Sequence, residues 1–464
     1  MDFLEYVEFL KQKQVRVQPM GFMPGKLPSR LFDWQRSVTE WSVKRGRAAM
    51  FEDCGLGKTG QQLAWADQVS ERTGSPVIVL APLAVAPQTK REGEKFGIPV
   101  NIAETDADIL PGVNVTNYEK LDKFTLSRFS GVVLDESSIL KAYTGAVKRQ
   151  IISAFSETPY RLSCSATPAP NDLMELLNQA EFLGVMKSNE ALACWFIADQ
   201  SDSGHYRLKG HAEKDFWRWV ASWAVCIEKP SDIGFSDEGY VLPPLAEHDV
   251  LLKGSEGADP LAAIREKPDM SATGYHAEKR KTLEQRAEHC AEIAASSDEQ
   301  YVIWCYQNDE ADLLKKLLPE AVEVRGSDKA GTKERAALDF IDGKRRVLIS
   351  KPSIFGYGLN FQNCRNAVFC GLDFSYESYY QAVRRMYRFG QPLPVKVWRV
   401  VGERERAILD TIDHKARMKQ QMARGMAEAM REFQTEAVRG REFNLTLEKQ
   451  SADFPAWLRS ENVT

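Results

Sequence analysis

The sequence lacks the features that assign a protein to a membrane, a secreted or a zinc-binding class. No apolar run approaches the ~20 residues that cross a bilayer. The start of the chain, MDFLE, is acidic and has neither the basic region nor the apolar core of a secretory signal. The eight cysteines form no Cys-x-x-Cys pair and have no histidine at finger spacing, which is typical of core thiols. We therefore expect a cytoplasmic protein.

A strong excess of one charge is also missing. The chain has 61 lysines and arginines against 65 aspartates and glutamates, a net charge of −4. The molecule as a whole is therefore not a polycation, and any contact with nucleic acid must be local.

With 464 residues, 43% of them hydrophobic, the chain is too long for one ordinary core and suits two or three domains.

A phosphate-binding loop is the first motif that the sequence does contain. Residues 55–59 read Gly-Leu-Gly-Lys-Thr, with an apolar run before them and a helical pattern after them. Glycines let such a loop approach phosphates, and the helix adds its positive end. Lys58 would hold the β and γ phosphates, and Thr59 a magnesium ion. The predicted nucleotide-binding residues here are Gly55, Leu56, Gly57, Lys58, Thr59 and Gly60. Because Glu52 replaces the usual glycine five residues before Gly57, this motif alone leaves an ordinary glycine-rich loop possible.

Short apolar runs alternate with helical patterns in two series, which indicates two α/β lobes with parallel sheets. The runs are 48–51, 77–81, 114–116, 131–134 and 161–164, then 301–304, 322–324, 346–350, 367–370 and 395–400. The predicted organisation is an N-terminal segment (1–30), an ATP-binding lobe (31–184), a mainly helical insertion with a linker (185–295), a second lobe (296–425) and a tail (426–464). Aromatic residues between 216 and 223 favour the core of a small helical subdomain over a base-stacking surface.

Two adjacent carboxylates, Asp135 and Glu136, end the apolar run at 131–134. Ligands bind at the strand ends of open α/β sheets. Asp135 can hold magnesium, directly or through water, while Glu136 can orient and deprotonate an attacking water. A plain turn would also favour Asp and Ser. The position after a phosphate loop favours the catalytic interpretation.

An arginine-rich segment lies in the second series, at 381–391. Helical spacing would put Gln381, Arg385 and Arg388 on one face, at i, i+4 and i+7. Grouped arginines without a matching carboxylate favour a bound anion, and a γ-phosphate held by the other lobe fits. An arginine finger of this kind contributes on the order of 10³ to 10⁵ in rate. A basic helix on nucleic acid is the alternative.

The order of these motifs resembles that of superfamily 2 helicases, most closely the Swi/Snf-type group of double-stranded DNA translocases, over residues 31–412. The resemblance implies two RecA-like lobes, with ATP and Mg²⁺ bound between them. It also implies that Gln35 recognises adenine and that Gly358 lies near the nucleotide. The nucleic-acid contacts that it implies are Pro82, Asn117, Ser165, Thr167, Ser350 and Asn360.

Ser138 departs from the family, which usually has His or Asp at the end of the Asp-Glu box. We expect a DNA-stimulated ATPase that moves on DNA and favours duplex DNA. The chain resembles a minimal form of such motors, typical of phages and bacteria. The expected location is therefore the cytoplasm of a bacterium or of a phage-infected cell. One alternative is an RNA or single-strand helicase of the same superfamily. Another is a non-hydrolysing nucleotide-dependent DNA clamp, which Ser138 makes conceivable. The sequence predicts no particular protein partner.

Overall fold

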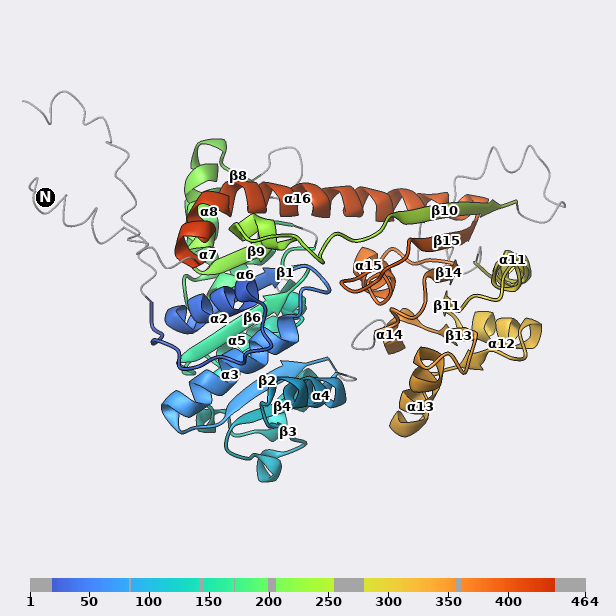
Figure 1. The fold of residues 1–464 in the computed structure, drawn as a ribbon. Helices are drawn as coiled ribbons and strands as arrows, with labels where there is room; N and C mark the ends of the chain where they lie inside the picture. The colour runs from blue at the N-terminus through green and yellow to red at the C-terminus, as the bar shows by residue number, and fades with distance from the viewer. Residues whose placement is uncertain are drawn as a thin grey trace, which may run out of the picture.

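Two α/β lobes lie side by side in the computed structural model, joined by one long helix (Figure 1). The structure describes residues 19–82, 85–141, 145–170, 172–198, 206–253, 279–355 and 360–438. Both main sheets consist of parallel strands, as the alternation of apolar runs and helices predicts. The predicted fold class of two RecA-like parallel-sheet lobes is confirmed.

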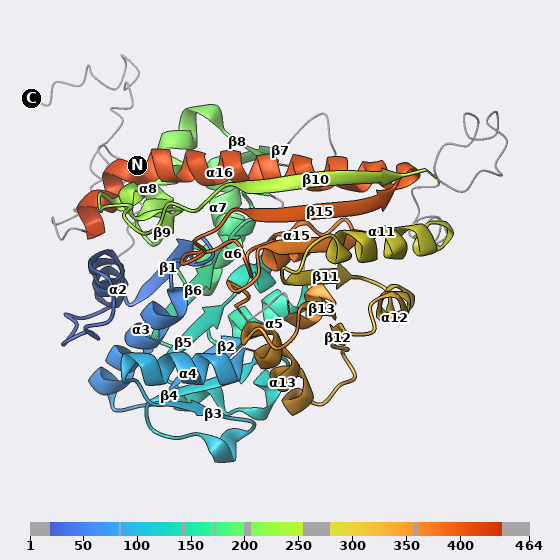
Figure 2. The same ribbon diagram turned by 45° about the vertical axis from the view of Figure 1, so that its right-hand side comes forward.

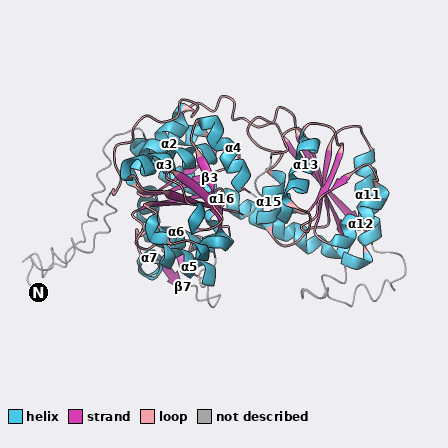
Figure 3. Ribbon diagram, turned by 90° about the horizontal axis from the view of Figure 1, so that it is seen from below, coloured by secondary structure: helices cyan, strands magenta, loops and turns pink. Residues whose placement is uncertain are grey.

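Lobe 1 contains a seven-stranded sheet in the order β3-β4-β2-β5-β6-β1-β9. The strands are β1 (Arg47–Glu52), β2 (Val77–Ala81), β3 (Val100–Ile102), β4 (Val113–Asn117), β5 (Gly131–Asp135), β6 (Tyr160–Ser165) and β9 (Ala224–Ile227). The helices α2 (Asp33–Arg45), α3 (Lys58–Thr73) and α4 (Ala86–Phe96) cover one face, and α5 (Ala146–Ala154), α6 (Glu175–Phe182) and α7 (Ser188–Trp195) the other (Figure 3). A short helix, η4 (Ser137–Lys141), follows β5. Beyond α7 lie the antiparallel pair β7 (Phe196–Ala198) and β8 (Tyr206–Leu208), and helix α8 (Glu213–Ala221).

Lobe 2 contains a six-stranded sheet in the order β10-β15-β14-β11-β13-β12. Its strands are β10 (Leu245–Leu252), β11 (Tyr301–Cys305), β12 (Val322–Glu323), β13 (Val347–Ser350), β14 (Asn366–Cys370) and β15 (Val395–Gly402). Its helices are α11 (Leu283–Ala295), α12 (Asn308–Leu317), α13 (Ala330–Ile341), α14 (Pro352–Phe355) and α15 (Tyr376–Val383). Helix α15 lies on the side that faces lobe 1 (Figure 3).

Helix α16 (Arg406–Val438) crosses from lobe 2 to lobe 1. Its 33 residues span ~50 Å at 1.5 Å per residue, enough to reach across both sheets (Figure 2). Met426 and Met430 are buried in the lobe 1 core, and Gln434 Nε2 donates to Cys226 O at 3.2 Å. Residues 426–438, expected to start a tail, therefore continue a helix that ties the lobes together.

Every strand predicted from the two series is present, with small shifts at the ends. The segment expected as a helical insertion contains α7, α8 and α11, but it also supplies an edge strand to each sheet, β9 in lobe 1 and β10 in lobe 2. Strand β9 is four buried apolar residues directly after α8, and so short a run cannot be told from more helix by periodicity. The domain limits themselves stay a prediction.

The aromatic residues of that segment belong to the lobe 1 core. Phe216, Trp217, Trp219 and Trp223 are buried, which confirms the core interpretation over a base-stacking surface. Six cysteines are buried, while Cys54 is half-buried and Cys194 is exposed. Within the described part of the chain, no helix has the length and apolar character needed to cross a membrane.

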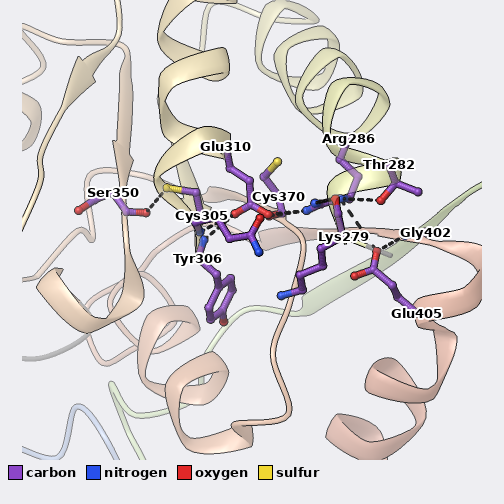
Figure 4. Close-up of polar contacts among 11 residues, drawn as sticks. Lys279, Thr282, Arg286, Cys305, Tyr306, Glu310, Ser350, Cys370, Gly402 and Glu405 are labelled. Carbon is purple, nitrogen blue, oxygen red and sulfur yellow. Dashed lines mark hydrogen bonds and ion pairs between the residues drawn. The ribbon is translucent and has the colours of Figure 1, made fainter. Parts of the chain in front are cut away.

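A buried ion cluster joins α11, α12 and the short helix η7 (Glu403–Glu405) in lobe 2 (Figure 4). Arg286 is fully buried, and its Nη1 donates to Glu310 Oε1 at 2.7 Å and to Cys370 O at 3.1 Å. Its Nη2 and Nε donate to Lys279 O and Thr282 Oγ1. The other oxygen of Glu310 accepts two backbone N–H bonds at the start of α12. The charges of Arg286 and Glu310 are therefore both compensated by hydrogen-bond partners.

Candidate nucleotide-binding cleft

The phosphate-binding loop connects β1 to α3, as predicted. Gly55 and Gly57 have φ of 92° and 80°, a region that favours glycine. A Cβ on Gly55 would lie 2.8 Å from the backbone nitrogen of Phe389 in lobe 2, and one on Gly57 would lie 2.5 Å from Gln35 Nε2. Both glycines are thus required by backbone conformation and by close neighbours, and the loop lies against the second lobe.

Lys58 begins α3, and its ammonium group turns back onto the loop. Its Nζ donates to Glu52 O at 2.6 Å and to Asp53 O at 3.2 Å. Burial by itself lowers the pKa of Lys58, but Cys54, Glu136 and the other nearby acidic groups outweigh burial and raise that pKa. The side chain is therefore a fixed positive charge among backbone carbonyls.

Glu52, which replaces the usual glycine, is the last residue of β1 and points into the lobe interior. It is fully buried, and its Oε2 accepts a hydrogen bond from Gln61 Nε2 at 2.8 Å. Burial raises the pKa of its carboxyl group to about 7. The side chain does not line the cleft, so this departure leaves the phosphate-facing side of the loop unchanged.

Asp135 and Glu136 lie at the carboxyl end of β5, beside the loop. Asp135 Oδ1 accepts from Gln62 Nε2 at 2.8 Å. Glu136 has φ of +55°, unlike any other described non-glycine residue, a strain of about 1–3 kcal/mol that concentrates at functional sites. Its Oε2 is buried and has no hydrogen-bond partner among the described residues. Burial and the Asp135 charge raise the pKa of Glu136 to about 7. Such a carboxylate is poised to accept a proton.

The predicted helix through Gln381, Arg385 and Arg388 is wrong in its second half. Helix α15 ends at Val383, and both arginines lie in the turns after it. Tertiary hydrogen bonds override the helical spacing, since Arg385 O accepts from Phe361 N at 2.9 Å. The side chains still reach one place. Arg385 Nη2 donates to Gln381 Oε1 at 3.2 Å, and Arg388 donates to Asn360 Oδ1.

A cleft of about 640 Å³ between the lobes gathers all five predicted catalytic residues. Its lining includes Gly55, Lys58, Thr59, Asp135 and Glu136 from lobe 1, and Gln381, Arg385 and Arg388 from lobe 2. Burial, assisted by the charge of Arg385, lowers the pKa of Arg388 to about 10. The lysine and arginine donors, the Glu136 oxygen and the glycine turns together fit a polyphosphate with a divalent cation.

The other predicted nucleotide contacts lie outside this lining. Gln35 is buried; its Nε2 donates to Leu56 O at 2.7 Å, and its Oε1 accepts from Phe32 N at 3.0 Å. Gly60 packs under Phe96, where a Cβ would lie 2.5 Å from the ring. Gly358 is not among the described residues. The adenine contact of Gln35 stays a prediction.

Five of the predicted nucleic-acid residues lie at carboxyl ends of strands or in the loops that follow, mostly as buried side chains, and Asn360 lies between α14 and β14. Ser165 Oγ accepts from Thr167 N at 3.0 Å, and Ser350 Oγ donates to Val324 O at 3.1 Å. Asn117 ends β4 with a buried Oδ1 that has no partner. Pro82 lines the cleft, and Asn360 contacts Arg388. Their contact with DNA stays a prediction.

An ion cluster between the lobes was not predicted. Asp53 of the phosphate-binding loop binds Arg384 and the Tyr380 hydroxyl of lobe 2, and Lys419 Nζ of α16 is 3.8 Å away. Burial would raise the pKa of Asp53, but Arg384 and Lys419 lower it to about 2. Burial lowers the pKa of Lys419 to about 8. No local pattern indicates a pair so far apart in sequence.

Comparison with known proteins finds similarity to helicases over part of the chain. Residues 283–390 match the model of the helicase conserved C-terminal domain. The mouse DNA annealing helicase and endonuclease ZRANB3 is 28% identical over 182 residues, which cover 35% of this chain and 17% of that protein. The Arabidopsis thaliana "Probable ATP-dependent DNA helicase CHR12" is 25% identical over 232 residues, 44% of this chain and 20% of that protein. The matched segments thus span a fifth or less of these relatives.

Among solved structures, the Sulfolobus solfataricus SWI2/SNF2 ATPase core in complex with dsDNA is similar, with 16% identity and a TM-score of 0.41, over 90% of this chain and 98% of that one. The cleft between the two lobes has the residues of a candidate nucleotide-binding site. Over part of its length, this chain is therefore similar to the helicase conserved C-terminal domain and to relatives named as DNA helicases or as SWI/SNF-related proteins.

Proposed function

We propose that the chain is a DNA-stimulated ATPase that binds ATP between its lobes and couples hydrolysis to movement on DNA, with duplex favoured. The observation that carries this proposal is the cleft, where the phosphate-binding loop and the Asp135–Glu136 pair of lobe 1 face Arg385 and Arg388 of lobe 2. Each lobe supplies only half of the groups. Hydrolysis would therefore depend on how the lobes sit against each other.

Lobe 1 would bind the phosphates and activate water. Lys58 would leave the carbonyls of Glu52 and Asp53 for the β and γ phosphates. Thr59 and Asp135 would hold Mg²⁺, which supplies charge neutralisation at the transferred phosphoryl group. Glu136 would orient the attacking water and accept its proton, a task that suits a carboxylate with a raised pKa.

Lobe 2 would complete the site with its arginines. Arg385 and Arg388 would stabilise the charge that develops on the γ-phosphate. Both are drawn into the cleft by α15 and the turns that follow it. Closure of the lobes on ATP and release after hydrolysis would move DNA contacts in one lobe relative to the other.

The DNA part of the proposal is supported by the position of the candidate contacts and by the names of the relatives. Asn117, Ser165 and Ser350 end strands of the two sheets, where loops can present backbone amides to phosphates. Phosphate contacts suit movement along DNA because they are the same at every step. Two of the relatives are named as DNA helicases.

The test is steady-state ATP hydrolysis without nucleic acid and then with duplex DNA, single-stranded DNA or RNA. Glu136→Gln serves as the inactive control, with ATP binding retained. Stimulation by duplex DNA is the expected result. Stimulation by single strands or RNA alone would instead favour a helicase for those substrates, and no hydrolysis under any condition would leave a nucleotide-dependent clamp.

A further inference from the structure

Glu377, which none of the sequence motifs singles out, joins the two lobes beside the cleft. It lies in the first turn of α15, with 13% of its side chain exposed. Its Oε1 accepts a hydrogen bond from Ser138 Oγ at 2.8 Å, and its Oε2 binds Lys141 Nζ at 2.6 Å. Both partners belong to η4 of lobe 1. One carboxylate thus bridges the lobes, with a separate lobe 1 partner for each oxygen.

The lobe 1 side of this bridge is held firmly. Gln179 Nε2 donates to Ser137 O at 3.0 Å, and Asn178 Nδ2 donates to Leu140 O at 2.8 Å. These bonds from α6 fix the backbone of η4 at both ends. The segment directly follows Glu136, whose backbone is already strained. A force on η4 therefore reaches the carboxylate that faces the cleft instead of being absorbed by a loose loop.

The lobe 2 side of the bridge leads to the arginines. Helix α15 has eight residues, so Glu377 lies only about two turns from the turn that carries Arg385 and Arg388. A helix this short moves as one body. The contact that Glu377 makes at its start therefore helps to set where the guanidinium groups after its end enter the cleft.

We infer that Glu377 is a positioning residue for ATP hydrolysis, which docks α15 on η4 through Ser138 and Lys141 and so aligns Arg385 and Arg388 with Glu136. The inference rests on the proposed function. It also accounts for Ser138, since a hydroxyl can donate to Glu377. An aspartate in that place, common in the family that the sequence resembles, would repel the carboxylate.

A set of variants separates the two contacts. Glu377→Ala removes both, and Glu377→Gln keeps an acceptor for Ser138 but loses the ion pair. Ser138→Ala removes only the hydrogen bond. Lys141→Glu combined with Glu377→Lys swaps the charges of the pair. Glu104→Gln is the matched control, because it breaks an ion pair with Lys120 that lies within lobe 1.

Two measurements on the full chain test the inference. The first is kcat and KM for ATP with duplex DNA, and the second is hydrogen-exchange protection of residues 376–388 with a non-hydrolysable ATP analogue. We expect Glu377→Ala to lower kcat by roughly tenfold to a hundredfold, since a displacement of ~1 Å can cost on the order of a hundredfold. KM and Tm should stay close to wild type, and protection should fall. For Glu377→Gln and Ser138→Ala, kcat and protection should lie between the values of wild type and Glu377→Ala. The charge swap should recover much of the lost kcat.

A Glu377→Ala variant with wild-type kcat and wild-type protection would overturn the inference. So would a loss of kcat that accompanies an equal fall in Tm in Glu377→Ala and that the charge swap does not reverse, because it would indicate a merely structural role. A wild-type chain without ATPase activity contradicts the proposed function instead. Hydrogen exchange then still reports whether Glu377 docks α15.

Discussion

Arg286 in the interior of lobe 2 and Arg388 in the cleft are both arginines of one lobe, but their partners differ. Arg286 binds Glu310, two backbone carbonyls and Thr282, all within one lobe. Arg388 binds the neutral side chain of Asn360, and burial and Arg385 lower its pKa. The interior arginine thus has a carboxylate partner, while the cleft arginine Arg388 contacts a neutral amide and has a lowered pKa. Titratable groups with perturbed pKa values in a cleft mark a candidate ligand site.

The same contrast holds for the carboxylates. Glu310 accepts from Arg286 and from the backbone N–H groups of Tyr306 and Gln307. Glu136 has a positive φ and a buried Oε2 without a partner. Substitutions in the interior should therefore change stability, and substitutions in the cleft should change turnover. Substitutions of Arg388, Glu136, Arg286 and Asp53 test that division.

Arg388→Ala should have the largest effect and should fall on the rate. Loss of an arginine finger costs on the order of 10³ to 10⁵ in kcat. Because Arg388 forms no ion pair with a carboxylate among the described residues, thermal stability should stay near wild type. DNA-stimulated ATP hydrolysis and the thermal midpoint, measured on the same preparation, check both parts. Wild-type turnover in this variant would show that Arg388 is not an arginine finger.

Glu136→Gln should lower kcat by on the order of 10² to 10⁴, the share of a general base. The variant should also remove a pH dependence. A carboxyl group whose pKa rises from 4.5 to about 7 on folding binds its proton more tightly in the native state, so stability falls as pH rises through that interval. Urea unfolding at pH 5 and pH 8 should show a smaller fall for the variant. An equal fall in the free energy of unfolding between pH 5 and pH 8 for variant and wild type would contradict a raised pKa at Glu136.

Arg286→Met should act on stability instead. It leaves Glu310 buried without its guanidinium partner, and breaking a buried pair costs about 3–5 kcal/mol. Urea unfolding measures the loss. A matched control is Arg346→Met, whose partner Glu320 is half exposed. Equal losses in the two variants would show that burial of the pair does not matter.

Asp53→Asn should have the smallest effect of the four substitutions. It should change both stability and turnover, because Asp53 lies in the phosphate-binding loop and contacts lobe 2. It weakens the contact of the phosphate-binding loop with Arg384, an interlobe interaction of about 0.5–3 kcal/mol. The carboxyl pKa falls from 3.8 to about 2 on folding, so this stability is present above pH 4 and is lost as pH falls through 2. Acid unfolding of wild type and variant should therefore converge at low pH. A constant difference across that range would exclude the ion pair as its source.

Local patterns predicted what depends on a few neighbouring residues. The apolar runs predicted ten strands, and the glycine spacing predicted a loop that the structure places between β1 and α3. The Asp135–Glu136 pair was found because it ends a buried strand, where open sheets place ligands. The helical spacing of Arg385 and Arg388 misled, because tertiary hydrogen bonds end α15 at Val383.

The sequence by itself determined the two parallel-sheet lobes, the loop and the chemistry available in each lobe, because these depend on periodicity and on residue type. Only the tertiary structure decided that α16 crosses back to lobe 1, that β9 and β10 extend separate sheets, and that Glu377 and Arg384 bind the opposite lobe. Such contacts join residues more than 200 positions apart. Their energy comes from packing and charge pairing in the folded chain, which leave no periodic trace in the sequence.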